Sequence, residues 1–587
     1  MAWILAIYEL LPRYRTLAKP LAVTLASLAA LLIAEKMGVA QQAPSQPRYD
    51  TRQTEKSLEA LQLGHGGAAG SPVRLPSSPK AEPTRRNSKP LFKLTSVVVE
   101  GSKTVAAGAI DEIYRSYIGK KVSQADLAAI AEAITEAYRG AGYHLTRAFV
   151  PPQDVKNGRI RVKVVEGYIG DVVIRGDGAD RFGVRLLLAP VVGERPSQLK
   201  TLERQLMLIN DSPGVRIVDT VLEEIGKASG KFRLVVSIQT WEIFQAFGFD
   251  NQGTSAVGPL EAYSTTAFNS SFFPGDTFVV NASTTPNSVR EFGFGKLAYD
   301  VPIGTNGVRI GADALYSNVA PGDGRRQTNT NSETKTLEVK GSVVPIETRK
   351  SSLWLTAVAG ITDSLERDSA GMHYDDHLRT LGLIADYKLN DRFAGWNYLT
   401  LAFRQGFTIL GASQKDDDLL SRAGASGNFS IFDFAFSRYQ PLSDVWSVKV
   451  SASGQWASGP LLISQQFYLG DSFYGPGYYS GDSGIWAYGE MRFDQSVSNA
   501  VLKGYEIYGF FDKGAVWSFN NDGQILSIAS AGAGIRFFLA DQWQAGVGFA
   551  VPVHAGTTAN DSHGVRFLFT LSNSFKLCPQ RAQLRCT

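Results

Sequence analysis

The chain has 587 residues, and its 59 Lys and Arg nearly balance its 55 Asp and Glu, which argues against a nucleic-acid-binding surface. This length predicts several domains. The low charged fraction of 19% and the 58 glycines favour strands and turns. The two cysteines, Cys578 and Cys586, lie in the last ten residues, so neither a disulfide framework nor a zinc site organises the fold. They could form a local bridge or remain free thiols.

The N-terminus has the features of a secretory signal peptide over residues 1–40. Basic residues at Arg13, Arg15 and Lys19 precede an apolar run over 21–34, and small residues follow at 38–40. The run is about 14 residues, which is short for a spanning helix, although a retained anchor is the alternative. No later stretch reaches ~18 apolar residues, so no transmembrane helix is expected.

Residues 41–90 are rich in Pro, Ser, Gln, Gly and Arg and read as a flexible linker. Its few leucines allow one short helix near 54–63, which could be a mobile plug or no element at all.

Residues 91–167 form the first compact unit, with the predicted order β-α-α-β-β. A strand is expected at 97–100, one helix at 110–117 and a second helix that begins at Ser123, with Asp126 at the capping-box position. A strand over 145–150 and the Asn157-Gly158 turn signal complete an α+β unit with a final alternating strand.

Residues 168–240 repeat this organisation loosely. Strands are expected at 172–174 and 232–238, with a helix over 199–209 that ends at Asp211-Ser212-Pro213-Gly214. Two tandem units with open sheet edges suit docking by strand addition of an extended peptide, whereas plain spacers are the alternative.

From residue 241 to residue 575 the pattern changes to alternating segments of roughly ten residues with aromatic ends. A lipid-embedded sheet must close on itself to pair its backbone groups. The predicted fold class is therefore a transmembrane antiparallel β-barrel of about sixteen strands, preceded by two α+β domains. A soluble sandwich or propeller is the competitor, and residues 576–587 form a tail. The expected strands include 277–283, 353–361, 399–409, 446–456, 505–516, 528–538, 543–551 and 565–575.

The stretch 467–494 has two different halves. Gly, Ser, Asp and Pro crowd its first half, which is therefore expected to be neither strand nor helix. Its second half alternates, with Ile485 and Met491 on an apolar face and Glu490 and Arg492 on a polar one.

No residue pattern indicates an enzyme, a cofactor or a metal site. The segment His373-Tyr374-Asp375-Asp376-His377 contains ligand-type residues, but a solvated extracellular loop is the preferred interpretation.

Together these segments resemble the outer-membrane transporters of two-partner secretion, the hemolysin and filamentous-hemagglutinin transporter family (TpsB; ShlB/FhaC/HecB). The two small units resemble POTRA domains, and Asp250-Asn251-Gln252-Gly253 resembles the family's first barrel hairpin. The resemblance also implies that Phe575, an aromatic residue on the last strand, is a barrel insertion signal. The residues of the first unit that match the family are Gly142, Tyr143, Arg147, Pro151, Gln153, Asp154, Gly158 and Val164-Val165-Glu166-Gly167.

The glycine-rich stretch resembles the family's loop that folds back into the barrel lumen. Pro476 stands where that loop carries an arginine, and the resemblance makes Asp512 (followed by Gly514) the arginine's wall partner. Arg492 could replace the missing cation, Asp512 could be hydrated, the loop could be anchored differently, or transport could be impaired. The matching loop residues are Gly475, Pro476, Gly477, Tyr478, Ser480, Gly481 and Asp482.

The resemblance implies secretion of an unfolded partner exoprotein, captured by periplasmic domains and passed through an outer-membrane pore. The expected partner is a large β-helical exoprotein, and the transporter is expected to be a monomer in outer-membrane lipid, with no cofactor. Alternatives are a factor that inserts other barrels and a passive porin or receptor.

Overall fold

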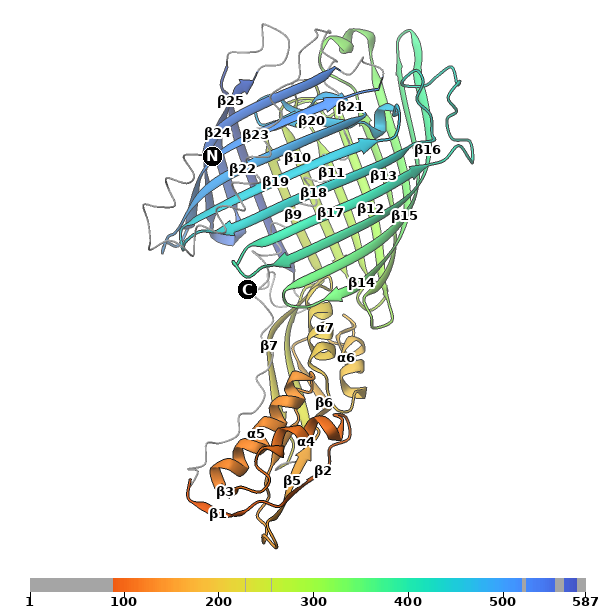
Figure 1. The fold of residues 1–587 in the computed structure, drawn as a ribbon. Helices are drawn as coiled ribbons and strands as arrows, with labels where there is room; N and C mark the ends of the chain where they lie inside the picture. The colour runs from red at the N-terminus through yellow and green to blue at the C-terminus, as the bar shows by residue number, and fades with distance from the viewer. Residues whose placement is uncertain (1–87, 227–228, 255, 520–523, 555–563, 578–587) are drawn as a thin grey trace.

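The computed structural model describes residues 88–226, 229–254, 256–519, 524–554 and 564–577, and Figure 1 shows two small units joined to one end of a barrel. The predicted signal peptide, the helix near 54–63 and both cysteines lie outside the described residues. Within the described ranges, no helix is long and apolar enough to cross a membrane.

The first unit has the predicted α+β organisation, with one addition. A three-stranded sheet, in the order β2-β5-β4, supports two helices, and a separate pair joins β1 to β3. Asn157 and Gly158 both adopt positive φ, as the predicted tight turn requires. Its elements are β1 (Pro90–Lys93), β2 (Ser96–Glu100), α4 (Ala107–Arg115), β3 (Lys121–Ser123), α5 (Gln124–Gly140), β4 (Arg147–Phe149) and β5 (Arg159–Val165).

Helix α5 shows how sequence determines this unit. Ser123 and Asp126 form the predicted capping box, in which the Ser123 hydroxyl accepts from the Asp126 amide and the Asp126 carboxylate accepts from the Ser123 amide. The predicted stripe of α5 is buried, with Ile130, Ile134 and Tyr138 fully covered by the sheet and by α4. Burial of a side chain of this size contributes about 1.5–3 kcal/mol.

The second unit repeats the order strand, two helices, two strands. Its sheet order is β6-β8-β7, so β6 and β7 are the edges. Helix α6 and strand β7 are additional to the predicted elements: α6 carries an internal Pro190, and β7 has an irregularity between Ile217 and Asp219. Its elements are β6 (Tyr168–Arg175), α6 (Val184–Gly193), α7 (Leu199–Asn210), β7 (Val215–Glu224) and β8 (Lys231–Thr240).

Sixteen antiparallel strands form a closed barrel, as predicted. The last strand returns to the first, with Thr570 opposite Asp250 and Leu577 opposite Ile243. Strand β26 therefore continues two residues past the expected end at Phe575, and β17 ends at Gly406, before the expected 409. The barrel strands are β9 (Ile243–Asp250), β10 (Glu261–Asn269), β11 (Thr277–Thr284), β12 (Phe292–Ile303), β13 (Val308–Val319), β14 (Asn331–Glu347), β15 (Ser351–Asp368), β16 (Gly371–Asn390), β17 (Trp396–Gly406), β18 (Ser430–Pro441), β19 (Trp446–Ala457), β22 (Ser483–Ser496), β23 (Leu502–Trp517), β24 (Ile525–Leu539), β25 (Gln544–His554) and β26 (Arg566–Leu577).

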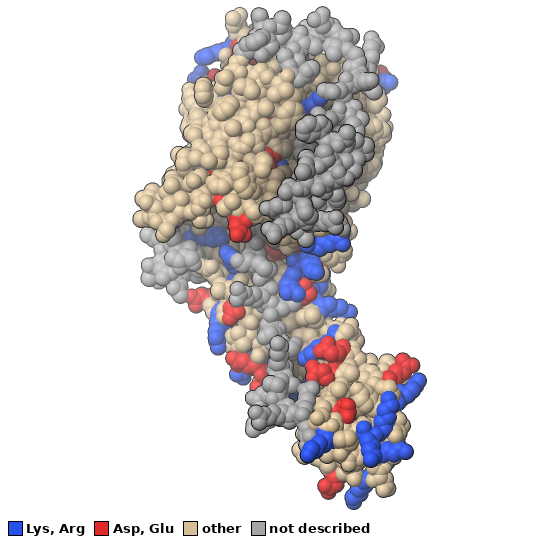
Figure 2. Space-filling model, turned by 60° about the vertical axis from the view of Figure 1, so that its left-hand side comes forward, with Lys and Arg blue, Asp and Glu red and all other residues tan. Residues whose placement is uncertain are grey.

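The barrel is apolar outside and polar inside. Along β14, Leu337 and Val339 are 52% and 54% exposed on the outer face, while Lys340 reaches inward to Asp313 at 3.1 Å. Figure 2 shows the same contrast: the visible barrel wall is mostly uncharged, and charged side chains gather on the two small units. This arrangement is what a lipid-facing sheet with a hydrated lumen requires.

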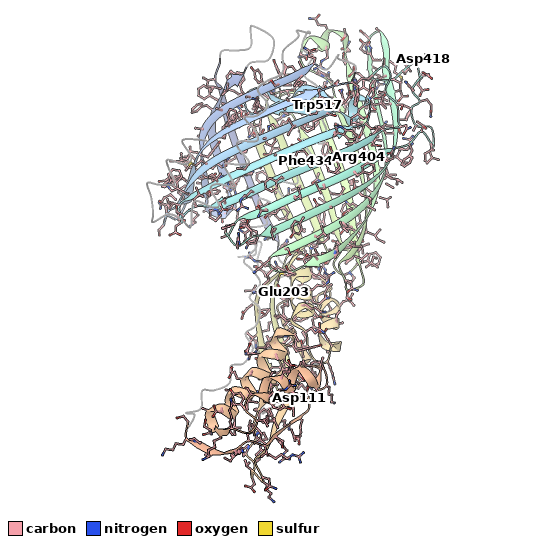
Figure 3. The ribbon with its side chains drawn as sticks, in the orientation of Figure 1. Asp111, Glu203, Arg404, Asp418, Phe434 and Trp517 are labelled. Atoms are coloured by element: carbon pink, nitrogen blue, oxygen red, sulfur yellow. The ribbon has the colours of Figure 1, made fainter. Side chains whose placement is uncertain are left out.

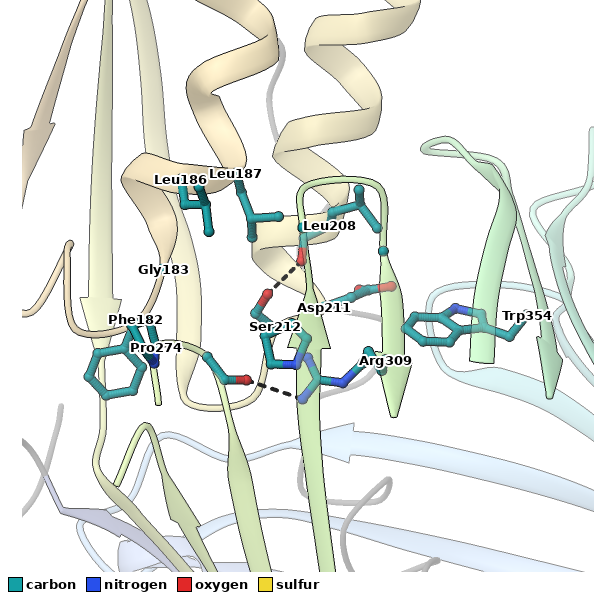
Figure 4. A pocket seen from close by; sticks show the side chains of 14 residues that line it. Phe182, Gly183, Leu186, Leu187, Leu208, Asp211, Ser212, Pro274, Arg309 and Trp354 are labelled. Atoms are coloured by element: carbon teal, nitrogen blue, oxygen red, sulfur yellow. Dashed lines mark hydrogen bonds between the residues drawn. The ribbon is translucent and has the colours of Figure 1, made fainter. Parts of the chain in front are cut away.

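The second unit is fastened to the barrel turns nearest to it. Arg204 on α7 donates to the carbonyls of Asn306 and Val344 at 2.9 and 2.6 Å, and Glu203 accepts from the Arg349 amide. Figure 3 shows Glu203 at this junction. Beside these contacts, Figure 4 shows a small cleft lined by α6, α7 and the barrel turns, where Arg309 donates to the Gly275 carbonyl.

Candidate functional site: the lumen hairpin

The glycine-rich stretch is a β-hairpin, formed by β20 (Phe467–Asp471) and β21 (Gly475–Gly481). We call residues 467–481 the lumen hairpin. The prediction that this segment is not a strand is therefore wrong. Its glycines permit the pairing: Gly475 and Gly477 adopt positive φ, and any side chain on Gly470 would overlap Gly475.

The lumen hairpin packs on the inner wall of β22, β23 and β24. Leu469 and Tyr479 are both 1% exposed and contact Val516 and Ile528 of the wall. Gly514 accounts for part of this fit, because a β-carbon there would overlap the Leu469 side chain. The hairpin thus covers an apolar patch on the inner face of the barrel wall.

Asp512 faces the hairpin, and its hairpin partner is Ser472 rather than the residue at position 476, where the family carries an arginine. The Ser472 amide and hydroxyl donate to the Asp512 carboxylate at 3.0 and 2.7 Å, and Ser530 donates to its other oxygen. Among the described residues, no Lys or Arg lies within ion-pair distance of Asp512, which is 1% exposed. Four hydrogen bonds from Ser472 and Ser530 stand where the family has an arginine beside this carboxylate. This agrees with the alternative that the loop is anchored differently.

Arg492 points into the lumen, as strand alternation predicts, but serves another carboxylate. It pairs with Glu490 and lies 3.5 Å from Glu506. Arg536 also pairs with both glutamates, at 2.8 Å from Glu490. These four side chains form a charge network on β22–β24. The alternative that Arg492 replaces the missing cation at Asp512 is therefore wrong.

Asp482, which ends the motif, makes the strongest anchor of this region. It is fully buried and pairs with Arg422, whose Nη2 lies 3.2 Å from the carboxylate. The backbone amides of Leu461 and Phe519 donate to it at 2.9 and 3.0 Å. Sequence reasoning missed Arg422 because it lies in the long connection between β17 and β18 and has no motif around it.

A second missed arginine holds the tip of the hairpin. Arg566, on β26, donates to the Phe473 carbonyl at 3.1 Å. It also donates to the carbonyls of Asn251 and Gly253, which follow β9. A wall arginine thus anchors the hairpin tip through a main-chain carbonyl, separately from the serine bonds at Asp512.

The remaining motif residues of the hairpin have structural contacts. Tyr478 lies between the rings of Tyr474 and Tyr479, with centroids 4.5 and 4.7 Å away, and the Ser480 hydroxyl donates to Gln466. Gly481 lies so close to Trp517 that a side chain would not fit.

Several motif residues of the first unit fasten it to the second. The Gly142 carbonyl accepts from the Leu199 amide at 2.9 Å, Gly167 accepts from Ser197, and Arg147 pairs with Glu224 of β7. The ring of Tyr143 lies edge-on to that of Tyr138.

Three other residues of the first-unit motif have local positions. Gln153 exchanges two hydrogen bonds with the Arg161 backbone and donates to the Pro151 carbonyl, while Asp154 is exposed.

Phe575 and the two histidines of the 373–377 segment lie in barrel strands. Phe575 is half-buried and lies opposite Gln245 in the closing strand pair. His373 and His377 lie in strand β16 rather than in the expected loop, and they pair with Asp368 and Asp363. In the part of the chain that the structure describes, no three His, Cys, Asp or Glu side chains are grouped to hold a metal ion.

Comparison with known families agrees with this architecture. The model of the ShlB-type POTRA domain matches residues 92–167, and that of the haemolysin secretion/activation protein ShlB/FhaC/HecB matches residues 233–537. The chain belongs to this family of two-partner secretion transporters. It is accordingly an outer-membrane protein whose POTRA domains lie in the periplasm. We refer below to the first unit as POTRA1 and, for its similar order of elements, to the second unit as POTRA2.

Individual relatives are distant. The heme/hemopexin transporter protein HuxB of Haemophilus influenzae (strain 86-028NP) is 23% identical over 498 residues, covering 80% of this chain and 86% of HuxB. The outer membrane transporter CdiB of Escherichia coli O6:K15:H31 (strain 536 / UPEC) is 25% identical over 207 residues, covering 35% of this chain and 34% of CdiB. The solved structure of CdiB from Escherichia coli shares the fold, with a TM-score of 0.71 and 18% identity over 89% of this chain and 97% of that one.

Proposed function

We propose that this transporter exports its partner exoprotein as an extended chain, which docks on POTRA2 and passes through the lumen when the hairpin moves. The observation that carries the proposal is the alignment of three parts: POTRA2 fastened at the periplasmic end, a polar lumen, and a hairpin held inside it. The relatives HuxB and CdiB are both described as transporters, which is consistent with export.

Strand β7 is the docking edge that this geometry favours. It is ten residues long, lies at the edge of its sheet and runs from Glu224, which contacts POTRA1, to Val215, next to the barrel. Val218 and Val221 on its solvent side are 66% and 42% exposed, so an incoming strand meets both open backbone groups and apolar side chains.

The lumen hairpin sets the barrier to transport. Its withdrawal must release the Arg422–Asp482 pair, the Arg566 bonds and the serine bonds to Asp512. These contacts hold the hairpin in its closed position, so the arriving chain must displace it. No catalytic step is needed, and folding of the exoprotein outside could supply direction.

The test is secretion of the partner exoprotein by variants on opposite edges of the same sheet. Val218→Lys with Val221→Lys on β7 is expected to reduce secretion strongly, whereas Val173→Lys on β6 leaves it unchanged. Deletion of residues 92–240 should abolish secretion while the barrel still inserts. If the β7 variant secretes normally while Val173→Lys does not, β6 is the docking edge; normal secretion by the deletion variant overturns the proposal.

A factor that inserts other barrels is the remaining alternative for POTRA-plus-barrel chains. A general loss of outer-membrane proteins on depletion of this chain would favour it over export.

A further inference from the structure

Arg566 occupies a place that the transport proposal alone does not explain. It begins β26 and points into the lumen, while its neighbours Val565 and Phe567 are 53% and 75% exposed on the outer face. Strand β26 is the one that closes the barrel against β9, and we call this pairing the seam.

The guanidinium of Arg566 joins the lumen hairpin to the seam. One nitrogen, Nη1, donates to the Phe473 carbonyl at the hairpin tip at 3.1 Å. The other, Nη2, donates to the carbonyls of Asn251 and Gly253, at 2.8 and 2.6 Å, in the segment that follows β9. A planar guanidinium holds such donors in a fixed fork, so the three acceptors are positioned relative to one another.

The same end of the seam depends on Asn251. Its side-chain amide donates to the Phe567 carbonyl at 2.8 Å, and its side-chain oxygen accepts from the Phe569 amide at 2.8 Å. The Arg566 bond to the Asn251 carbonyl therefore acts on the residue that holds β26 and β9 together beyond their last paired positions.

The hairpin tip is shaped for this contact. Gly475 has a φ of +83°, and a β-carbon there would lie 2.8 Å from Nη1 of Arg566. The positive φ favours glycine, and a β-carbon there would displace the end of the Arg566 side chain.

We propose that Arg566 is a positioning residue that couples the closed position of the lumen hairpin to closure of the seam at its extracellular end. When the hairpin withdraws, the guanidinium loses one of its three acceptors and its fixed orientation, and the Asn251 region loosens. Coupling of this kind is reciprocal, so loosening the seam also releases the hairpin. The inference rests on the proposed movement of the hairpin but not on the identity of the exoprotein.

The test uses the purified full chain in detergent and in planar bilayers, without an exoprotein. Arg566→Ala is expected to raise the frequency and size of channel openings. Hydrogen exchange of the amides of residues 566–571 should become about tenfold faster, while residues 572–577 keep wild-type rates. Deletion of residues 467–482 should accelerate exchange of 566–571 in the same way although Arg566 is intact.

Two further variants make the test specific. Gly475→Ala keeps the arginine but displaces it, and is expected to change both readouts in the same direction as Arg566→Ala, which covers the case in which the alanine variant does not fold. Arg379→Ala is the control, because Arg379 also donates to main-chain carbonyls, those of Leu378 and Leu410, and pairs with Asp363, but contacts neither the hairpin nor the seam.

Wild-type openings in both Arg566→Ala and Gly475→Ala overturn the anchoring role. Unchanged exchange of 566–571 after removal of the hairpin overturns the coupling. Neither outcome bears on export, which the secretion assay measures separately.

Discussion

The POTRA domains and the barrel place their apolar side chains in opposite directions: inward in the POTRA domains and outward in the barrel. In POTRA1, Ile130, Ile134 and Tyr138 are fully buried in a core, whereas the comparable apolar residues of β14, Leu337 and Val339, are more than half exposed. Water surrounds the first and lipid surrounds the second, so the apolar residues point to opposite sides of the sheet. Apolar clusters also occur on the inner side of the wall, and the lumen hairpin covers one of them.

The largest expected effect tests the water-surrounded half of this comparison. Ile134→Ala removes a fully buried side chain from POTRA1 and should cost about 2–5 kcal/mol of that domain's stability. Limited proteolysis should then cleave POTRA1 while the barrel keeps its heat-modifiable migration. Ile118→Ala, at a 40% exposed position, is the control and should remain resistant. Equal resistance of both variants would contradict the assigned core.

The next effect tests the lipid-surrounded half. Val339→Arg places a charge on the outer face and should destabilise the barrel by about 2–4 kcal/mol, depending on depth. The same change at Thr336, which points inward to Thr362, should be tolerated because the lumen is polar. Denaturant titration of the folded barrel in lipid vesicles measures both variants, and the reverse ranking would mean that the faces are assigned wrongly.

The smallest effect concerns pH and is confined to the POTRA domains. Burial lowers the pKa of His144 from 6.5 to about 4, because the charged imidazolium is disfavoured there. The unfolded state therefore binds the proton first, so the stability that neutral His144 contributes above pH 6.5 is lost as the pH falls toward 4. Hydrogen exchange of POTRA1 should accelerate over that window, and His144→Leu should flatten the profile. A wild-type profile that is flat between pH 6.5 and 4 would contradict this role.

Periodic features were predictable from the sequence, since they depend on neighbours along the chain. Alternation predicted the barrel and the inward direction of Arg492, and the capping box at Ser123 predicted the start of α5. Helix α6 escaped because its apolar residues run together around Pro190, and β7 because its alternation is interrupted near Val218.

The anchors of the lumen hairpin were not predictable in this way. Arg422 and Arg566 meet the hairpin region only through the closed barrel, 60 residues from Asp482 and 93 residues from Phe473. The Gly, Ser, Asp and Pro content of the hairpin predicts neither a strand nor a helix, but packing on the wall and close backbone approach determine its structure.

Single-channel conductance of the purified chain, with and without residues 467–482, tests the central claim most directly. We predict that the intact chain gives small, brief openings and that the deletion gives a large, steady pore, because the hairpin is held inside the lumen by Arg422, Arg566 and Asp512. An unchanged conductance after deletion would contradict the account, since the hairpin would then not be what closes the barrel.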